Sequence, residues 1–134
     1  MNYKRLDQAF ENAPILELSE SSKLILISDC HRGRGTSNDN FLKNQNLYFA
    51  ALRYYYREGF TYIELGDGDE LWENRSLRQI VDIHSNVFWL LSKYYEKNRL
   101  YLLYGNHDMV KRSLSFVRKN LSSYHCSNRM EDTP

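Results

Sequence analysis

Cysteine is scarce in this chain of 134 residues, and long apolar runs and an excess of charge are both missing. The two cysteines, Cys30 and Cys126, are too few for a disulfide framework and are typical of a reducing compartment. Apolar runs stay well short of the ~18 residues that a transmembrane helix needs. Residues 1–13 are charged and lack the apolar core of a signal peptide. We therefore expect a cytoplasmic protein that does not enter the membrane.

The charge balance also restricts the partners of the chain. A formal net charge of +1 gives no electrostatic reason to expect nucleic acid or an anionic membrane. The aromatic run YFAALRYYYREGFTY (residues 48–62), with Arg53 and Arg57, could stack on RNA bases. At helical spacing, the same tyrosines better suit a helix face that packs on a core. We expect no nucleic-acid-binding patch.

Three short apolar runs predict β-strands: KLILIS (23–28), FTYIEL (60–65) and RLYLLY (99–104). Each run is unbroken, which is typical of a strand buried on both faces of a sheet. Helical patterns lie between them, and strands that alternate with helices predict βαβ units with a parallel sheet. The expected fold class is therefore α/β, in a chain that reads as one domain over residues 1–134.

Capping residues support the expected helices. Asn38 or Asp39 and Ser76 are good N-caps, while Gly59 and Asn98 suit the left-handed exit at a helix end. The expected helices are 39–58, 77–97, 109–120 and, at the amino terminus, 3–11.

Polar residues gather where each predicted strand ends, in SDCHRG, GDGDE and GNHD. The carboxyl ends of parallel strands line the ligand-binding edge of an α/β sheet. Asp29 and Asp67 are 38 residues apart, and Asp67 and Asn106 are 39 apart, so each step spans one strand–helix unit. We therefore expect the three clusters to converge in space.

These residue types suit a metal site. Asp29 and His31 are two residues apart, so on an extended segment both side chains leave the same side. Asp67 has two carboxylate oxygens that could bridge two ions, and Asn106 offers a neutral carbonyl oxygen. Oxygen and nitrogen donors without a thiolate favour Mn, Fe or Zn. Two such ions, about 3.5–4 Å apart, could clamp a phosphate, generate a hydroxide nucleophile and stabilise the leaving oxygen.

The same residues resemble a known family. The series Asp29-x-His31, Gly66-Asp67-x-x-Glu70 and Gly105-Asn106-His107-Asp108 is similar to the calcineurin-like metallophosphoesterase motifs D-x-H, G-D-x-x-[DE] and G-N-H-[DE]. The resemblance covers residues 24–109. It implies a metal-dependent phosphoesterase that hydrolyses a phosphomonoester or phosphodiester. It also implies that Asp29 and His31 bind the first ion, that Asp67 bridges both ions, and that Asn106 binds the second.

The resemblance implies roles for further residues. His107 would be catalytic, acting on the phosphoryl group or the leaving group without binding metal. Glu70 and Asp108 would support the ligands, with Glu70 orienting His107. Arg32 and Arg34 could contact a phosphate, or could belong to a flexible loop.

Each residue also has a simpler interpretation. Residues 67–70 alone would suggest an acidic turn, and His31 alone a surface histidine. Asp69 could be solvated or a supporting residue. We expect His84 and Cys30 to be packed residues without a chemical role.

The carboxyl-terminal part departs from the resembling family. There, further strands carry a Gly-His and a Gly-His-x-His that complete both metal sites, whereas here only His125 follows, in an atypical tail (122–134). We expect the chain to be a truncated domain, the parallel βαβαβ half of an αββα sandwich. One sheet face would then be uncovered and prone to self-association, and phosphoesterase activity would be impaired. The alternative is a non-catalytic half-domain that retains weak metal binding.

Overall fold

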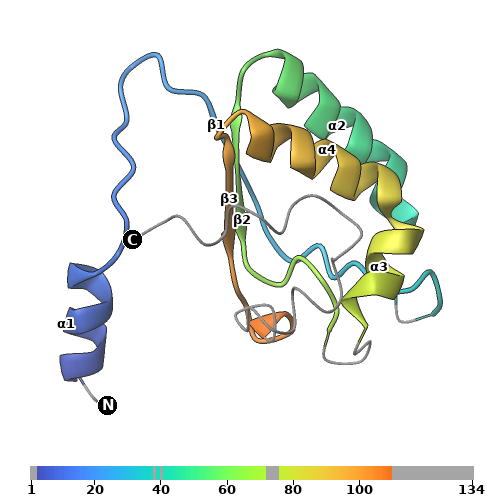
Figure 1. Ribbon diagram of the computed structural model, residues 1–134, viewed down its shortest axis with the longest axis horizontal. Helices are drawn as coiled ribbons and strands as arrows, with labels where there is room; N and C mark the ends of the chain where they lie inside the picture. The colour runs from blue at the N-terminus through green and yellow to red at the C-terminus, as the bar shows by residue number, and fades with distance from the viewer. Residues whose placement is uncertain (1–2, 38, 40, 72–75, 110–134) are drawn as a thin grey trace.

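Three parallel strands form the sheet of the computed structural model, which describes residues 3–37, 39, 41–71 and 76–109. β1 (Leu24–Ile27), β2 (Thr61–Leu65) and β3 (Leu100–Leu103) lie in the order β1-β2-β3, so each strand is beside the next along the chain. The three predicted strands and the α/β class are confirmed. All three strands therefore end at one edge of the sheet (Figure 1).

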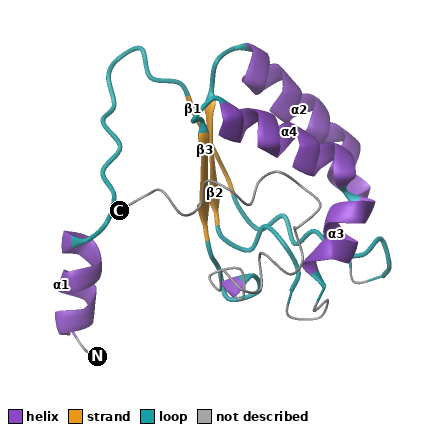
Figure 2. Cartoon of the chain, viewed as in Figure 1, coloured by secondary structure: helices purple, strands orange, loops and turns teal. Residues whose placement is uncertain are grey.

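Helices cover one face of this sheet. α2 (Gln45–Arg57) and α4 (Ser85–Glu96) lie side by side against it, and α3 (Leu77–Ile83) leads into α4 (Figures 1 and 2). The fully or nearly buried side chains between helices and sheet are Cys30, Phe41, Leu52, Tyr62, Val87, Leu90, Leu91 and Tyr94. Cys30 is thus a packed residue, as expected.

The first crossover helix begins later than predicted. A 3₁₀ turn at Leu42–Asn44 precedes α2, because the Asp39 carboxylate accepts the backbone N–H groups of Phe41 and Leu42 at 3.2 and 3.1 Å. The N-caps of the 3₁₀ turn and of α2 are Phe41 and Asn44, and neither makes a side-chain capping bond. The prediction that Asn38 or Asp39 is the N-cap is therefore wrong, although Asp39 binds backbone N–H groups at the start of the turn. The left-handed exit predicted at Gly59 is confirmed by its φ of 82°.

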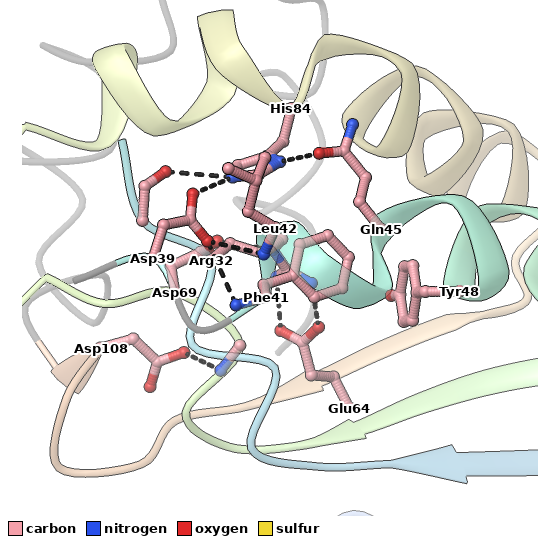
Figure 3. A network of polar contacts seen from close by, with 12 residues as sticks. Arg32, Asp39, Phe41, Leu42, Gln45, Tyr48, Glu64, Asp69, His84 and Asp108 are labelled. Atoms are coloured by element: carbon pink, nitrogen blue, oxygen red, sulfur yellow. Dashed lines mark hydrogen bonds and ion pairs between the residues drawn. The ribbon is translucent and has the colours of Figure 1, made fainter. Parts of the chain in front are cut away.

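The prediction of one continuous helix over 77–97 is wrong. His84 has φ −103° and ψ 35° and separates α3 from α4. Its buried imidazole contacts the Asp39 carboxylate at 2.8 Å and the Gly33 carbonyl at 3.1 Å, so side-chain bonds accompany the break (Figure 3). The predicted ends of this region are confirmed, with the Ser76 hydroxyl accepting the Gln79 N–H and Asn98 at φ 54°.

The opposite face of the sheet is open among the described residues. Leu26, Leu65 and Leu103 point away from the helices and are 55%, 47% and 52% exposed. The prediction that the strands are buried on both faces is therefore wrong for these residues. α1 (Tyr3–Glu11), at its predicted position, has no buried residue and lies apart from the sheet on this side (Figure 1). Self-association through the open face stays a prediction, and the expected helix 109–120 lies outside the described residues apart from Met109.

Candidate metal centre

The loops that follow the three strands are bonded to one another. The His31 N–H donates to the Asp67 carbonyl at 2.9 Å, and the Glu70 N–H donates to the Arg32 carbonyl at 2.9 Å. The third loop joins through the Leu71 N–H, which donates to the His107 carbonyl at 3.0 Å. The parallel pairing of β1 and β2 thus continues past the strands and holds the predicted site residues in register.

Three of the four predicted metal ligands come together. Asp29, His31 and Asp67 each offer a ligand atom within 4.8 Å of the others, although they come from two loops. Asp29 is exposed while His31 and Asp67 are partly buried, so the group is open to solvent. Asn106 lies in the loop after β3 and is exposed, and its role at a second ion stays a prediction.

The backbone at these three residues is unusual. Asp29, His31 and Asp67 have φ values of 54°, 49° and 50°, in the left-handed region that residues other than glycine rarely adopt. Such conformations cost about 1–3 kcal/mol each and cluster at functional sites. Among the described residues, the remaining non-glycine residue of this kind is Asn98, which ends a helix. Strained backbone is thus found at three of the predicted metal ligands.

Two glycines allow the loops after β2 and β3 to meet. Gly66 has φ 96°, and a Cβ there would lie 2.9 Å from the Gly105 nitrogen. A Cβ on Gly105 would overlap the Asp67 carboxylate. Both positions therefore require glycine if Asp67 is to keep its place.

Glu70 contacts two histidines. Its carboxylate oxygens lie 2.9 Å from Nδ1 of His31 and 2.9 Å from Nδ1 of His107. The contact with His107 joins the two residues that the family resemblance pairs, whereas the motifs give no sign of the contact with His31. Because a carboxylate accepts hydrogen bonds, each Nδ1 carries the proton in these contacts.

Asp108 fastens two loops together. Its buried carboxylate accepts the Gly105 N–H through Oδ1 at 2.7 Å and the Gly68 N–H through Oδ2 at 3.0 Å. Each oxygen therefore serves a different loop, which fits the supporting role that the resemblance implies.

We expect Asp108→Asn to lower the free energy of unfolding by about 1–3 kcal/mol. An asparagine has one accepting oxygen, so one of the two backbone N–H groups loses its partner. Chemical denaturation of Asp108→Asn beside Asp82→Asn, an exposed aspartate on α3, provides the comparison. Equal stability of the two variants would mean that Asp108 does not hold the loops.

Arg32 does not occupy the position expected of a phosphate contact. Its side chain is 1% exposed, and its guanidinium donates to Glu64 at 2.9 and 3.1 Å and to Asp69 at 2.7 Å (Figure 3). It also lies over the Phe88 ring. Burial alone would lower the pKa of Arg32, but the charges of Asp69 and Glu64 outweigh it and hold the pKa well above its ordinary value. We correct the prediction: Arg32 ties the first loop to β2 and to the second loop. Asp69 is its buried partner and is not solvated.

Two buried polar networks near this arginine leave little trace in the sequence. Tyr62 donates to Glu64 at 3.0 Å, its hydroxyl lies 2.8 Å from that of Tyr48, and burial raises the pKa of both phenols. Burial would raise the pKa of Asp39, but hydrogen bonds from Gly35 and His84 outweigh it and lower that pKa. The signal in the sequence was Glu64, a glutamate within an apolar strand run, because a buried charge needs a partner.

Comparison of the chain with protein-family models, with curated proteins and with solved structures gives no match. Among the described residues, no helix has the length and apolar character needed to cross a membrane. The function of the chain is therefore inferred from its motifs and from the geometry of the three loops.

Proposed function

We propose that this chain is a metal-dependent phosphoesterase of the calcineurin-like type that its motifs resemble. The observation that carries the proposal is the convergence of Asp29, His31 and Asp67 within 4.8 Å, each on left-handed backbone. The described fold is compatible with the proposal, since a parallel sheet with helices on one face and an open apolar face matches one half of an αββα sandwich.

The donor set fits divalent ions. Asp29, His31 and Asp67 supply carboxylate oxygens and one imidazole nitrogen, and Asn106 adds an amide oxygen. These donors suit Mn, Fe or Zn, and Asp67 would be a ligand of both ions. When bound, the ions would polarise a phosphoryl oxygen and activate water for attack on phosphorus.

The remaining residues orient the reacting groups. Glu70 accepts the Nδ1 protons of His31 and His107, which fixes both ring orientations. In the protonated state, His107 donates from Nε2 to a phosphoryl oxygen or to the leaving ester oxygen. The substrate of this proposal is a phosphomonoester or phosphodiester.

A second candidate is a metal-binding protein without turnover. It is favoured by the donor count among the described residues, because Asp29, His31 and Asp67 with Asn106 provide three donors for one ion and two for the other when Asp67 is shared. One weakly held ion cannot support two-metal hydrolysis. Measurement of aryl phosphate hydrolysis in manganese, together with the number of manganese ions bound, separates the two candidates.

The metal site is tested by Asp67→Asn. We expect manganese affinity to fall by roughly 100-fold or more, a larger loss than for Asp29→Asn or Asn106→Ala, because Asp67 would bridge both ions. Calorimetric titration measures the affinity. Asp82→Asn is the matched control, since Asp82 is exposed on α3 and outside the loops. Equal affinity of Asp67→Asn and the control would refute the proposed ligand.

A further inference from the structure

A second group of metal-binding side chains overlaps the proposed ligands. His31, Glu70 and His107 offer ligand atoms within 4.8 Å of one another. Nδ1 of His31 lies 2.9 Å from Oε2 of Glu70, and Nδ1 of His107 lies 2.8 Å from the same oxygen. Two imidazoles and one glutamate form a ligand set used for single catalytic zinc ions. We infer that these three side chains bind one zinc ion without Asp29 or Asp67.

The spacing of the three donors suits this ion. Zinc binds nitrogen and carboxylate oxygen at about 2.0–2.2 Å, so neighbouring donors of a tetrahedral site lie roughly 3.3 Å apart. The two nitrogen–oxygen distances observed are 2.9 and 2.8 Å, because hydrogen bonds now join these atoms. For zinc to bind both Nδ1 atoms, each neutral ring carries its proton on Nε2 instead. Each nitrogen then needs to move away from the Glu70 oxygen by only about half an ångström, which side-chain rotation provides.

The backbone already holds the three residues in place. The N–H of His31 is bonded to the Asp67 carbonyl, the N–H of Glu70 to the Arg32 carbonyl, and the N–H of His107 to the Asp67 carboxylate. The ring centroids of His31 and His107 lie 4.6 Å apart, and the two rings pack edge to face. A ligand set that needs little rearrangement loses little conformational entropy on binding.

Solvent reaches the two histidines of this group more than it reaches Glu70. The Glu70 side chain is 5% exposed, whereas the side chains of His31 and His107 are 20% and 26% exposed. An ion held between them would be covered on the Glu70 side and reachable from solvent on the histidine side. The site therefore has the form of three protein ligands with a fourth position for water.

The zinc site uses a different ligand set from the site of the proposed function, which is probed with manganese. His31 is common to both, but it would bind zinc through Nδ1 and the other ion through Nε2. Glu70 and His107 belong to the zinc set, and Asp29 and Asp67 to the other. Imidazole donors suit zinc, whereas carboxylate oxygens suit manganese, so substitutions should separate the two.

Zinc titration in an Asp67→Asn background tests the inference. The asparagine side chain keeps a carbonyl oxygen that can accept the His107 N–H, so the loop contact is retained. We expect this variant to bind one zinc ion, and added His107→Ala or Glu70→Gln to weaken that binding by roughly 100-fold or more. Added Asp82→Asn, at an exposed position, should leave zinc affinity unchanged. Cobalt in place of zinc should show the strong visible absorption of a tetrahedral ion.

Three results would overturn the inference: absence of zinc binding in the Asp67→Asn variant, unchanged zinc affinity after His107→Ala, or loss of zinc after Cys126→Ser. The last would place the ion on the cysteine outside the described residues. Manganese titration of the unsubstituted chain tests the proposed phosphoesterase site separately from the zinc site. If manganese fails to bind while zinc binding follows the expected pattern, the proposed phosphoesterase site fails and the zinc site stands.

Discussion

Replacement of Arg32 by methionine is expected to lower the free energy of unfolding by about 3–5 kcal/mol. Arg32 is 1% exposed and binds both Glu64 and Asp69, which are 0% and 1% exposed. Methionine retains most of the side-chain volume but removes the positive charge. Two carboxylates would then remain in the interior without their cation, and that penalty, more than the lost attraction, is the source of the large effect.

Urea unfolding of Arg32→Met measures this effect. Arg34→Met is the matched control in the same loop, because Arg34 is exposed and bonds the Gln79 side chain at 3.1 Å. Substitutions at such surface positions change stability by about 0.5 kcal/mol. A similarly small change in Arg32→Met would mean that Glu64 and Asp69 reach water, contrary to the buried ion pairs.

Local sequence signals account for the strands and helix ends. The apolar runs at 23–28, 60–65 and 99–104 each contain an observed strand, because burial against helices requires such residues. Gly59 and Asn98 end helices through their tolerance of positive φ. These features depend on residues close in the chain, so the sequence reveals them.

The break at His84 depends on contacts that a local pattern cannot reveal. The imidazole binds the Gly33 carbonyl, 51 residues away, and the Asp39 carboxylate, 45 residues away. Helical periodicity around His84 predicts a continuous helix. In the structure the helix is instead broken at His84, where these buried polar bonds are made. The exposure of Leu26 and Leu103 was equally hidden, since an apolar run does not say what covers each face.

The candidate site also contains some residues whose role the sequence predicts and others whose role it does not. Asp29, His31 and Asp67 could be found because equivalent strand ends in a parallel sheet must meet. The role of Arg32 could not, because its partners, Glu64 in β2 and Asp69 in the loop after β2, are 32 and 37 residues away. Adjacent residues thus differ in environment, with His31 partly open to solvent and Arg32 buried beside it.

His107→Ala is expected to lower the rate of phosphate ester hydrolysis by about 10²–10⁴-fold while manganese content is unchanged. In the proposed site His107 binds no manganese. It donates a proton from Nε2 while Glu70 holds Nδ1 at 2.9 Å. Alanine keeps the backbone N–H that donates to the Asp67 carboxylate at 2.9 Å, so the manganese ligand should remain in place.

The rate should be measured with an aryl phosphate in manganese buffer freed of zinc, because His107 also belongs to the inferred zinc site. Metal analysis of the same samples gives the manganese content, and Asp82→Asn again serves as the control.

Phosphate binding to the manganese-loaded chain gives a readout that needs no turnover. Loss of a charge-assisted hydrogen bond from His107 should weaken phosphate binding roughly 10-fold or more. If manganese is lost in proportion to rate or phosphate affinity, His107 is a metal ligand and not the proton donor. If rate and phosphate affinity both stay unchanged with manganese bound, His107 does not face the substrate, and the pairing with Glu70 serves the loops alone.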